Sequence, residues 1–147
     1  MNGSYDSRAT VSEIIIFDTS VLVDDLRTGC YHSRFQSITG LVRNSSVVLS
    51  ELWRGATRAA EREFVRILGK NHPTYTPSEN MWLDSGRILA KIRAEKGFTA
   101  DKLRDLHFDV LIALTARAHG GRVITSNRSD FELIRRERSF KLEVWFR

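Results

Sequence analysis

The segment IIIFDTSVLV, residues 14–23, places an aspartate directly after a continuous run of apolar, mostly β-branched residues. Such a run is typical of a strand that is buried on both faces, so we expect a strand over residues 14–17. Residues 47–49 and 122–125 have the same character, and we expect strands there too. A lone carboxylate buried at the end of such a strand is unfavourable unless a partner neutralises it, so Asp18 requires an explanation.

Longer segments with helical periodicity separate these strands. We predict helices over residues 51–70, 78–96, 103–119 and 129–138. Gly120 and Gly121 provide a helix stop. Strands that alternate with helices indicate an α/β fold with a mostly parallel central sheet and helices on both faces. In such sheets the functional site lies beyond the carboxyl ends of the strands.

Length and composition limit the class of protein. The 147 residues, 41% of them hydrophobic, suffice for one domain, which we place at residues 13–147 after a loose tail at residues 1–12. The single cysteine, Cys30, and the lack of a long apolar span or signal peptide favour a cytoplasmic protein without membrane insertion. The net charge of +5 is compatible with a polyanionic partner such as RNA or DNA, but is weak support by itself.

Oxygen-bearing side chains follow each predicted strand. Asp18 follows the first strand, Glu51 follows the second, and Asp130 lies shortly after the last. Asp109 shares the apolar, sheet-facing stripe of its helix, because apolar residues follow it at offsets of three, four and seven. Converging acids repel one another unless a divalent cation lies among them. Oxygen ligands without nearby Cys or His favour Mg²⁺ or Mn²⁺.

Helix capping is an alternative explanation for two of these acids. Asp18 is placed to cap the helix that follows the first strand, and Asn127 with Asp130 has the spacing of a capping arrangement. Capping explains each acid separately. Four acids at four such positions are harder to explain in this way.

Three segments of the chain resemble the PIN domain family. They are FDTSVLVDDL, SELWRGA and FDVLIALTARAHGGRVITSNRSDFELI, and their order and spacing are most similar to the VapC toxins of bacterial toxin–antitoxin pairs. The resemblance covers nearly the whole chain from Ile14. It implies a PIN-like three-layer sandwich, metal-dependent endoribonuclease activity on structured cellular RNA, and a cognate antitoxin as partner. We further expect a homodimer.

The resemblance also implies roles for individual residues. The family's acidic quartet falls on Asp18, Glu51, Asp109 and Asp130. The three aspartates are the implied ligands of Mg²⁺ or Mn²⁺, and Glu51 is either a further ligand or the group that orients the attacking water. The supporting polar groups are Thr125, Ser126 and Asn127. Asp105, one helical turn before Asp109, leaves open which of the two reaches the metal.

A line of arginines is predicted beside the site. If residues 51–70 form one helix, Arg54, Arg58 and Arg62 lie at intervals of four along one side, with Arg58 at nearly the azimuth of Glu51. These arginines are candidate contacts to RNA phosphates. A solvated face, partly paired with nearby glutamates, is the alternative, since exposed helix faces commonly carry such charges.

Other functions fit the chain less well. A response-regulator-like receiver requires a paired acid after the first strand and a late lysine, and we find no convincing lysine of this kind. Dinucleotide binding requires a G-x-G-x-x-G motif after the first strand, which this chain lacks. A non-catalytic RNA-binding scaffold with a PIN-like fold is the better alternative, although the complete set of acids argues against it.

Overall fold

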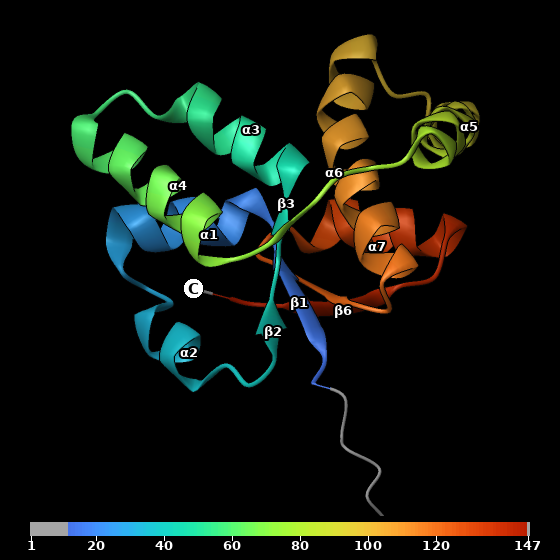
Figure 1. Ribbon diagram of the computed structural model, residues 1–147. Coiled ribbons are helices and arrows are strands. Elements are labelled where there is room, and N and C mark those ends of the chain that lie inside the picture. Colours follow the sequence, from blue (N-terminus) through green and yellow to red (C-terminus); the bar gives the residue numbers. More distant parts are fainter. Residues whose placement is uncertain (1–11, 147) are drawn as a thin grey trace, which may run out of the picture.

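The computed structural model describes residues 12–146, so the tail predicted at residues 1–12 lies outside the described residues except for its last position. The central sheet contains four parallel strands in the order β2-β1-β5-β6 (Figure 1). These strands are β1 (Ile14–Phe17), β2 (Leu41–Val42), β5 (Arg122–Thr125) and β6 (Lys141–Val144). A second, smaller parallel sheet pairs β3 (Asn44–Ser45) with β4 (Thr74–Tyr75).

Helices connect the strands and cover the sheet. In chain order they are α1 (Thr19–Thr28), α2 (His32–Ser37), α3 (Ser46–Gly55), α4 (Ala59–Asn71), α5 (Glu79–Lys96), α6 (Ala100–Ala118) and α7 (Arg128–Glu137). The long helices α5 and α6 pack against each other, and α3 and α6 lie at the same end of the molecule (Figure 1). Within residues 12–146, no helix is long and apolar enough to cross a lipid bilayer.

Burial along the strands shows that both faces of the sheet are covered. Ile15, Ile16 and Phe17 of β1 are all buried, although successive side chains of a strand point to opposite faces. Val123 and Ile124 of β5 are buried in the same way. The predicted α/β fold, with a mostly parallel sheet between helices, is therefore confirmed.

Several helix ends follow the sequence prediction closely. Helix α6 ends where expected, and Gly120 follows it with a φ of 63°, a left-handed conformation that glycine adopts without strain. Strand β6 forms one edge of the central sheet. Trp145, which follows β6, is 4% exposed and packs against the rings of Phe17, Tyr31 and Phe35.

The prediction of a strand at residues 47–49 was wrong, because these residues belong to α3. The Oγ of Ser45 accepts hydrogen bonds from the N–H groups of Val47 (3.2 Å) and Val48 (3.5 Å), which is an N-cap. The cap starts a helix whose buried residues are Val47, Val48 and Leu52. Glu51 consequently reaches the site from a helix and not from the end of a strand.

The single helix predicted over residues 51–70 was also wrong. The chain leaves helical geometry at Ala56 (φ −80°, ψ 99°), directly after Gly55, and a new helix, α4, begins at Ala59. The N–H of Arg58 donates a hydrogen bond to Oε1 of Glu61 at 3.0 Å, which stabilises this new start. Arg54 therefore lies on a different helix from Arg62, and the regular line of arginines does not exist.

Candidate active site

Asp18 lies at the carboxyl end of β1. Its N–H donates to the carbonyl oxygen of Ile124 at 2.8 Å, so the β1–β5 ladder continues into this residue. The residue is 3% exposed, and its Oδ2 accepts hydrogen bonds from the hydroxyls of Ser20 (2.7 Å) and Thr125 (2.8 Å). Asp18 occupies the N-cap position of α1, but its side chain forms no capping hydrogen bond. Burial raises the pKa of Asp18, while backbone hydrogen bonds from Thr19 and Ser20 lower it, so its carboxylate also contacts the start of α1.

The two hydroxyls beside Asp18 are fixed by the segment that follows β5. The Oγ of Ser20 accepts from the N–H of Ser126 at 3.1 Å, and the Oγ1 of Thr125 accepts from the N–H of Asn127 at 2.9 Å. Each hydroxyl can then direct its own proton at the Asp18 carboxylate. The Ser126 hydroxyl instead donates to Oδ2 of Asp24 at 3.1 Å, so its side chain contacts a different acid from the predicted ones.

Glu51 approaches the site from α3. Its Oε1 accepts a hydrogen bond from the hydroxyl of Thr19 at 2.9 Å, and its Oε2 lies 3.9 Å from Nη2 of Arg54. Burial raises the pKa of Glu51, as do the charges of Asp18 and Asp105, whereas the Thr19 hydroxyl and Arg54 lower it. Arg54 is the arginine that lies against Glu51, and not Arg58 as the predicted helix had implied.

Asp130 approaches from the first turn of α7. Its Oδ2 accepts a hydrogen bond from the Asn127 side-chain amide at 3.0 Å. Asn127 occupies the N-cap position of α7, but its side chain makes no capping hydrogen bond and contacts Asp130 instead. The Nζ of Lys102 lies 2.8 and 3.0 Å from the two carboxylate oxygens of Asp130, and this ion pair joins α6 to α7.

Asp109, on α6, experiences the charges of all the other acids. Its pKa is raised to about 9, chiefly by burial and also by the charges of Asp18, Asp130 and Glu51, while Lys102 opposes them. Asp105 is exposed and influences Glu51 at the rim of the site. The structure thus brings Asp18, Glu51, Asp109 and Asp130 into one electrostatic cluster, which we call the acidic quartet.

Three further residues of this site were not predicted: Thr19, Ser20 and Lys102. The two hydroxyls directly follow Asp18 in the sequence, so their position after a buried strand was a usable signal. Lys102 precedes Asp109 by seven residues, which is two helical turns and therefore the same helix face. Its pairing with Asp130 depends on how α6 packs against α7, and no local pattern predicts that.

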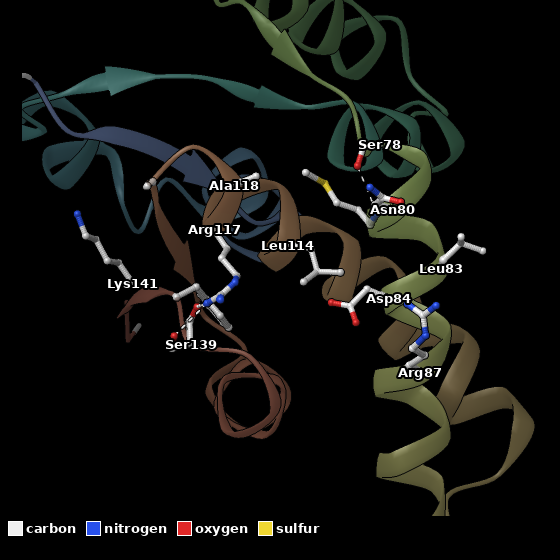
Figure 2. A pocket seen from close by; sticks show the side chains of 14 residues that line it. Ser78, Asn80, Leu83, Asp84, Arg87, Leu114, Arg117, Ala118, Ser139 and Lys141 are labelled. Atoms are coloured by element: carbon white, nitrogen blue, oxygen red, sulfur yellow. Dashed lines mark hydrogen bonds between the residues drawn. The ribbon is translucent and has the colours of Figure 1, made fainter.

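A hollow of the described surface lies apart from the acidic quartet. It has a volume of about 880 Å³ and lies between α5, the end of α6 and the segment that leads into β6. Figure 2 shows Asp84 and Arg87 on the α5 side, and Arg117 with Ser139 across from them. Gly120 and Gly121, which also line it, directly precede β5, so this hollow lies toward the amino ends of the strands.

The acidic quartet fits a hard divalent cation by donor type and charge. All its donors are carboxylate oxygens, and the pKa values of Asp18, Glu51 and Asp109 are raised chiefly by burial. Within residues 12–146, however, no three Asp, Glu, His or Cys side chains are arranged around one point as metal ligands. Asp130 is instead paired with Lys102, so three-ligand binding requires some side-chain movement.

The raised pKa of Asp109 leads to a prediction about the metal-free protein. In the unfolded chain this carboxyl titrates near its ordinary value of 3.8, whereas the folded protein holds its proton up to about pH 9. As the pH rises between these values, the unfolded state loses the proton first, so the free energy of unfolding falls. We predict that Asp109→Asn stabilises the metal-free protein at pH 8 by at least about 1 kcal/mol.

Urea unfolding in excess chelator at pH 4, 6 and 8 measures this effect. The stabilisation should grow with pH and be small at pH 4, where the native carboxyl is also neutral. Asp101→Asn is the control, because Asp101 lies on the same helix with its side chain 83% exposed, and it should show no such pH dependence. An Asp109→Asn protein that is less stable at every pH would contradict the electrostatic account.

The model of one protein family matches this chain. The PIN domain model matches residues 15–137, which includes the whole acidic quartet. Among curated proteins, no sequence match to the chain is found.

Several solved structures share the fold. The DNA-bound VapBC of Salmonella typhimurium is 21% identical with a TM-score of 0.70, and the match covers 91% of this chain and 99% of that one. VapBC2 of Rickettsia felis, bound to a promoter DNA fragment, is 18% identical over 90% and 99% of the two chains with a TM-score of 0.67. VapBC-1 of nontypeable Haemophilus influenzae is 18% identical with a TM-score of 0.64, and the match covers 90% of this chain and 98% of that one. The chain therefore belongs to the PIN domain family and has the fold found in these VapBC structures.

Proposed function

We propose that this protein is a divalent-metal-dependent endoribonuclease that acts as the toxin of a toxin–antitoxin pair. One observation carries the enzymatic part of the proposal: four buried or half-buried acids reach one site from different elements, and the pKa of Asp109 is raised to about 9, chiefly by burial and also by the charges of the other three. Such a cluster is destabilising without a cation, and catalytic sites are where folds keep unfavourable charge arrangements of this kind. The PIN domain match supports a nuclease.

Asp18, Asp109 and Asp130 are the proposed metal-binding residues. Thr125 and Ser20 orient the carboxylate of Asp18 by donating to the same oxygen. Asn127 holds one oxygen of Asp130 in the same way. Asp109 must lose its proton when a cation binds, so metal binding should release protons at neutral pH.

Glu51 is the proposed group that orients the attacking water. Its side chain is 18% exposed, and the Thr19 hydroxyl holds one of its two oxygens. Burial raises the pKa of Glu51, which makes it a better acceptor for a proton from water than an ordinary carboxylate. A bound divalent cation would supply Lewis-acid activation of the water and stabilise charge on the phosphate oxygens.

RNA is the proposed substrate, with Arg54 as its first contact. The guanidinium of Arg54 lies 5.7 Å from the ring centre of Phe108 and beside Glu51, and its side chain is 71% exposed. It can therefore reach a phosphate next to the site. Arg58 and Arg62 stay candidates further along the surface, although Nη1 of Arg62 already donates to the carbonyl oxygen of Thr57 at 3.0 Å.

An antitoxin is the proposed partner, because the solved structures that share this fold include a toxin–antitoxin complex and a member of the VapBC family of toxin–antitoxin systems. The apolar hollow of about 370 Å³ between α1, α2 and α4, lined by Phe17, Leu22, Phe35 and Phe64 among others, is a surface that an apolar segment of such a partner can fill. A homodimer and a cytoplasmic location remain predictions.

The alternative function, a non-catalytic RNA-binding scaffold, does not explain why an unfavourable acidic quartet is retained.

The proposed metal-dependent cleavage can be tested at Asp109. Asp109→Asn should abolish RNA cleavage while RNA binding stays largely intact, because the lost interaction acts on the transition state and not on phosphate contacts. Cleavage of a panel of cellular RNAs, with and without chelator, measures this, and expression in a bacterium should arrest growth only for the unchanged protein. Growth arrest by both proteins would favour the scaffold. Cleavage that persists in excess chelator would exclude the metal.

A second prediction concerns RNA binding. In the Asp109→Asn background, Arg54→Gln should weaken binding of single-stranded RNA and reduce the slope of log affinity against log salt by about 0.7, the value for one lost phosphate contact. Arg66→Gln is the matched control, since Nε of Arg66 donates to Glu63 at 2.8 Å on the exposed side of α4. An unchanged slope for Arg54→Gln would make Arg54 part of a solvated surface.

A further inference from the structure

Lys102 is a residue of the candidate site whose position helix stability does not explain. It is the third residue of α6, whose N-cap Thr99 accepts a hydrogen bond from the N–H of Lys102. A cation in the first turn of a helix is disfavoured by the helix dipole. Yet Nζ of Lys102 is placed 2.8 and 3.0 Å from the two oxygens of Asp130.

The position of Lys102 is that of a counter-ion for the acidic quartet. Its ammonium group contacts one member directly, and its charge lowers the pKa of another, Asp109. The ring of Phe98 lies 5.9 Å from Nζ and further favours a cation at this place. Lys102 therefore offsets part of the repulsion that a divalent cation would otherwise remove.

We propose that Lys102 is a built-in competitor of the metal, which holds Asp130 in the metal-free protein and must release it when a divalent cation binds. This inference rests on the proposed metal-dependent function. Both oxygens of Asp130 are engaged by Nζ, so a cation of two positive charges and the ammonium group compete for the same carboxylate. The Lys102 side chain is 38% exposed, so its ammonium group can move into solvent without repacking the core.

The competition has two consequences. Lys102 reduces the affinity of the site for metal, because its ion pair with Asp130 must break first. It also stabilises the metal-free protein, because it keeps the acidic quartet partly neutralised. The metal would then bind only at a sufficient free concentration of the cation. Without the cation, the Lys102–Asp130 ion pair would keep the fold stable.

A second lysine provides a matched control. Nζ of Lys91, on α5, lies 2.9 Å from Oε2 of Glu137 at the other end of α7. This ion pair also joins α7 to a neighbouring helix, but Glu137 does not belong to the acidic quartet. Replacing Lys91 therefore removes a comparable ion pair without affecting the proposed competition.

Calorimetric titration with Mn²⁺ tests the proposal on the unchanged protein, Lys102→Met, Lys102→Gln and Lys91→Met. Both Lys102 variants should bind Mn²⁺ roughly three- to tenfold more tightly, the effect of removing one partly exposed ion pair. Both should also unfold at a lower temperature in chelator. Added Mn²⁺ should raise their unfolding temperature by more than it raises that of the unchanged protein. Lys102→Gln can still donate a hydrogen bond to Asp130, which protects the test against a variant that fails to fold. Lys91→Met should leave the Mn²⁺ affinity unchanged.

Other outcomes would overturn the proposal. Equal Mn²⁺ affinity in the unchanged protein and both Lys102 variants would show that Lys102 does not compete, while the proposed function would stand. Weaker binding by the variants would mean that Lys102 organises the site for metal, which also contradicts competition. Absence of Mn²⁺ binding in all four proteins would remove the metal site itself, and the proposed function with it.

Discussion

Repulsion between carboxylates in a poorly solvated environment is the constraint on which the site depends. Asp18 is almost fully buried and Asp109 is half-buried, so bulk water hardly solvates the first and solvates the second only in part. Two ionised acids in such a place are costly, and the rise in the pKa of Asp109 to about 9 expresses that cost. The fold keeps these carboxylates together in spite of their repulsion. A cation bound among them would offset that repulsion.

The parallel sheet explains why the cost falls at this place. Strands β1 and β5 are neighbours in the sheet and end side by side. The pairing of the two strands therefore places Asp18 and Thr125 within hydrogen-bond distance of each other. The hydroxyls of Ser20 and Thr125 then fix the Asp18 carboxylate, and backbone N–H groups fix these hydroxyls in turn. Helices α3, α6 and α7 add the other acids around this rigid centre. A site supported in this way is preorganised, which is what catalysis by positioned charge requires.

The sequence was informative where local pattern and tertiary position agree. The buried strand ending in Asp18 and the helix stripe containing Asp109 were both predictable, because burial on both faces imposes a continuous apolar run and a helix face imposes its period. Residues 47–49 were misassigned because β-branched residues also form helices when a cap such as Ser45 starts one. Pairings such as Lys102 with Asp130 join residues 28 positions apart on different helices, and only the packed structure shows them.

The central claim is that the acidic quartet is a cation site, and its most direct test is crystallographic. Crystals grown or soaked with Mn²⁺ can be measured at a wavelength where manganese scatters anomalously, which identifies the ion independently of the protein model. The account predicts an anomalous peak bound by carboxylate oxygens of Asp18, Asp109 and Asp130. Ordered crystals at high Mn²⁺ concentration with no peak among these acids, or with Mn²⁺ bound only elsewhere, would contradict it.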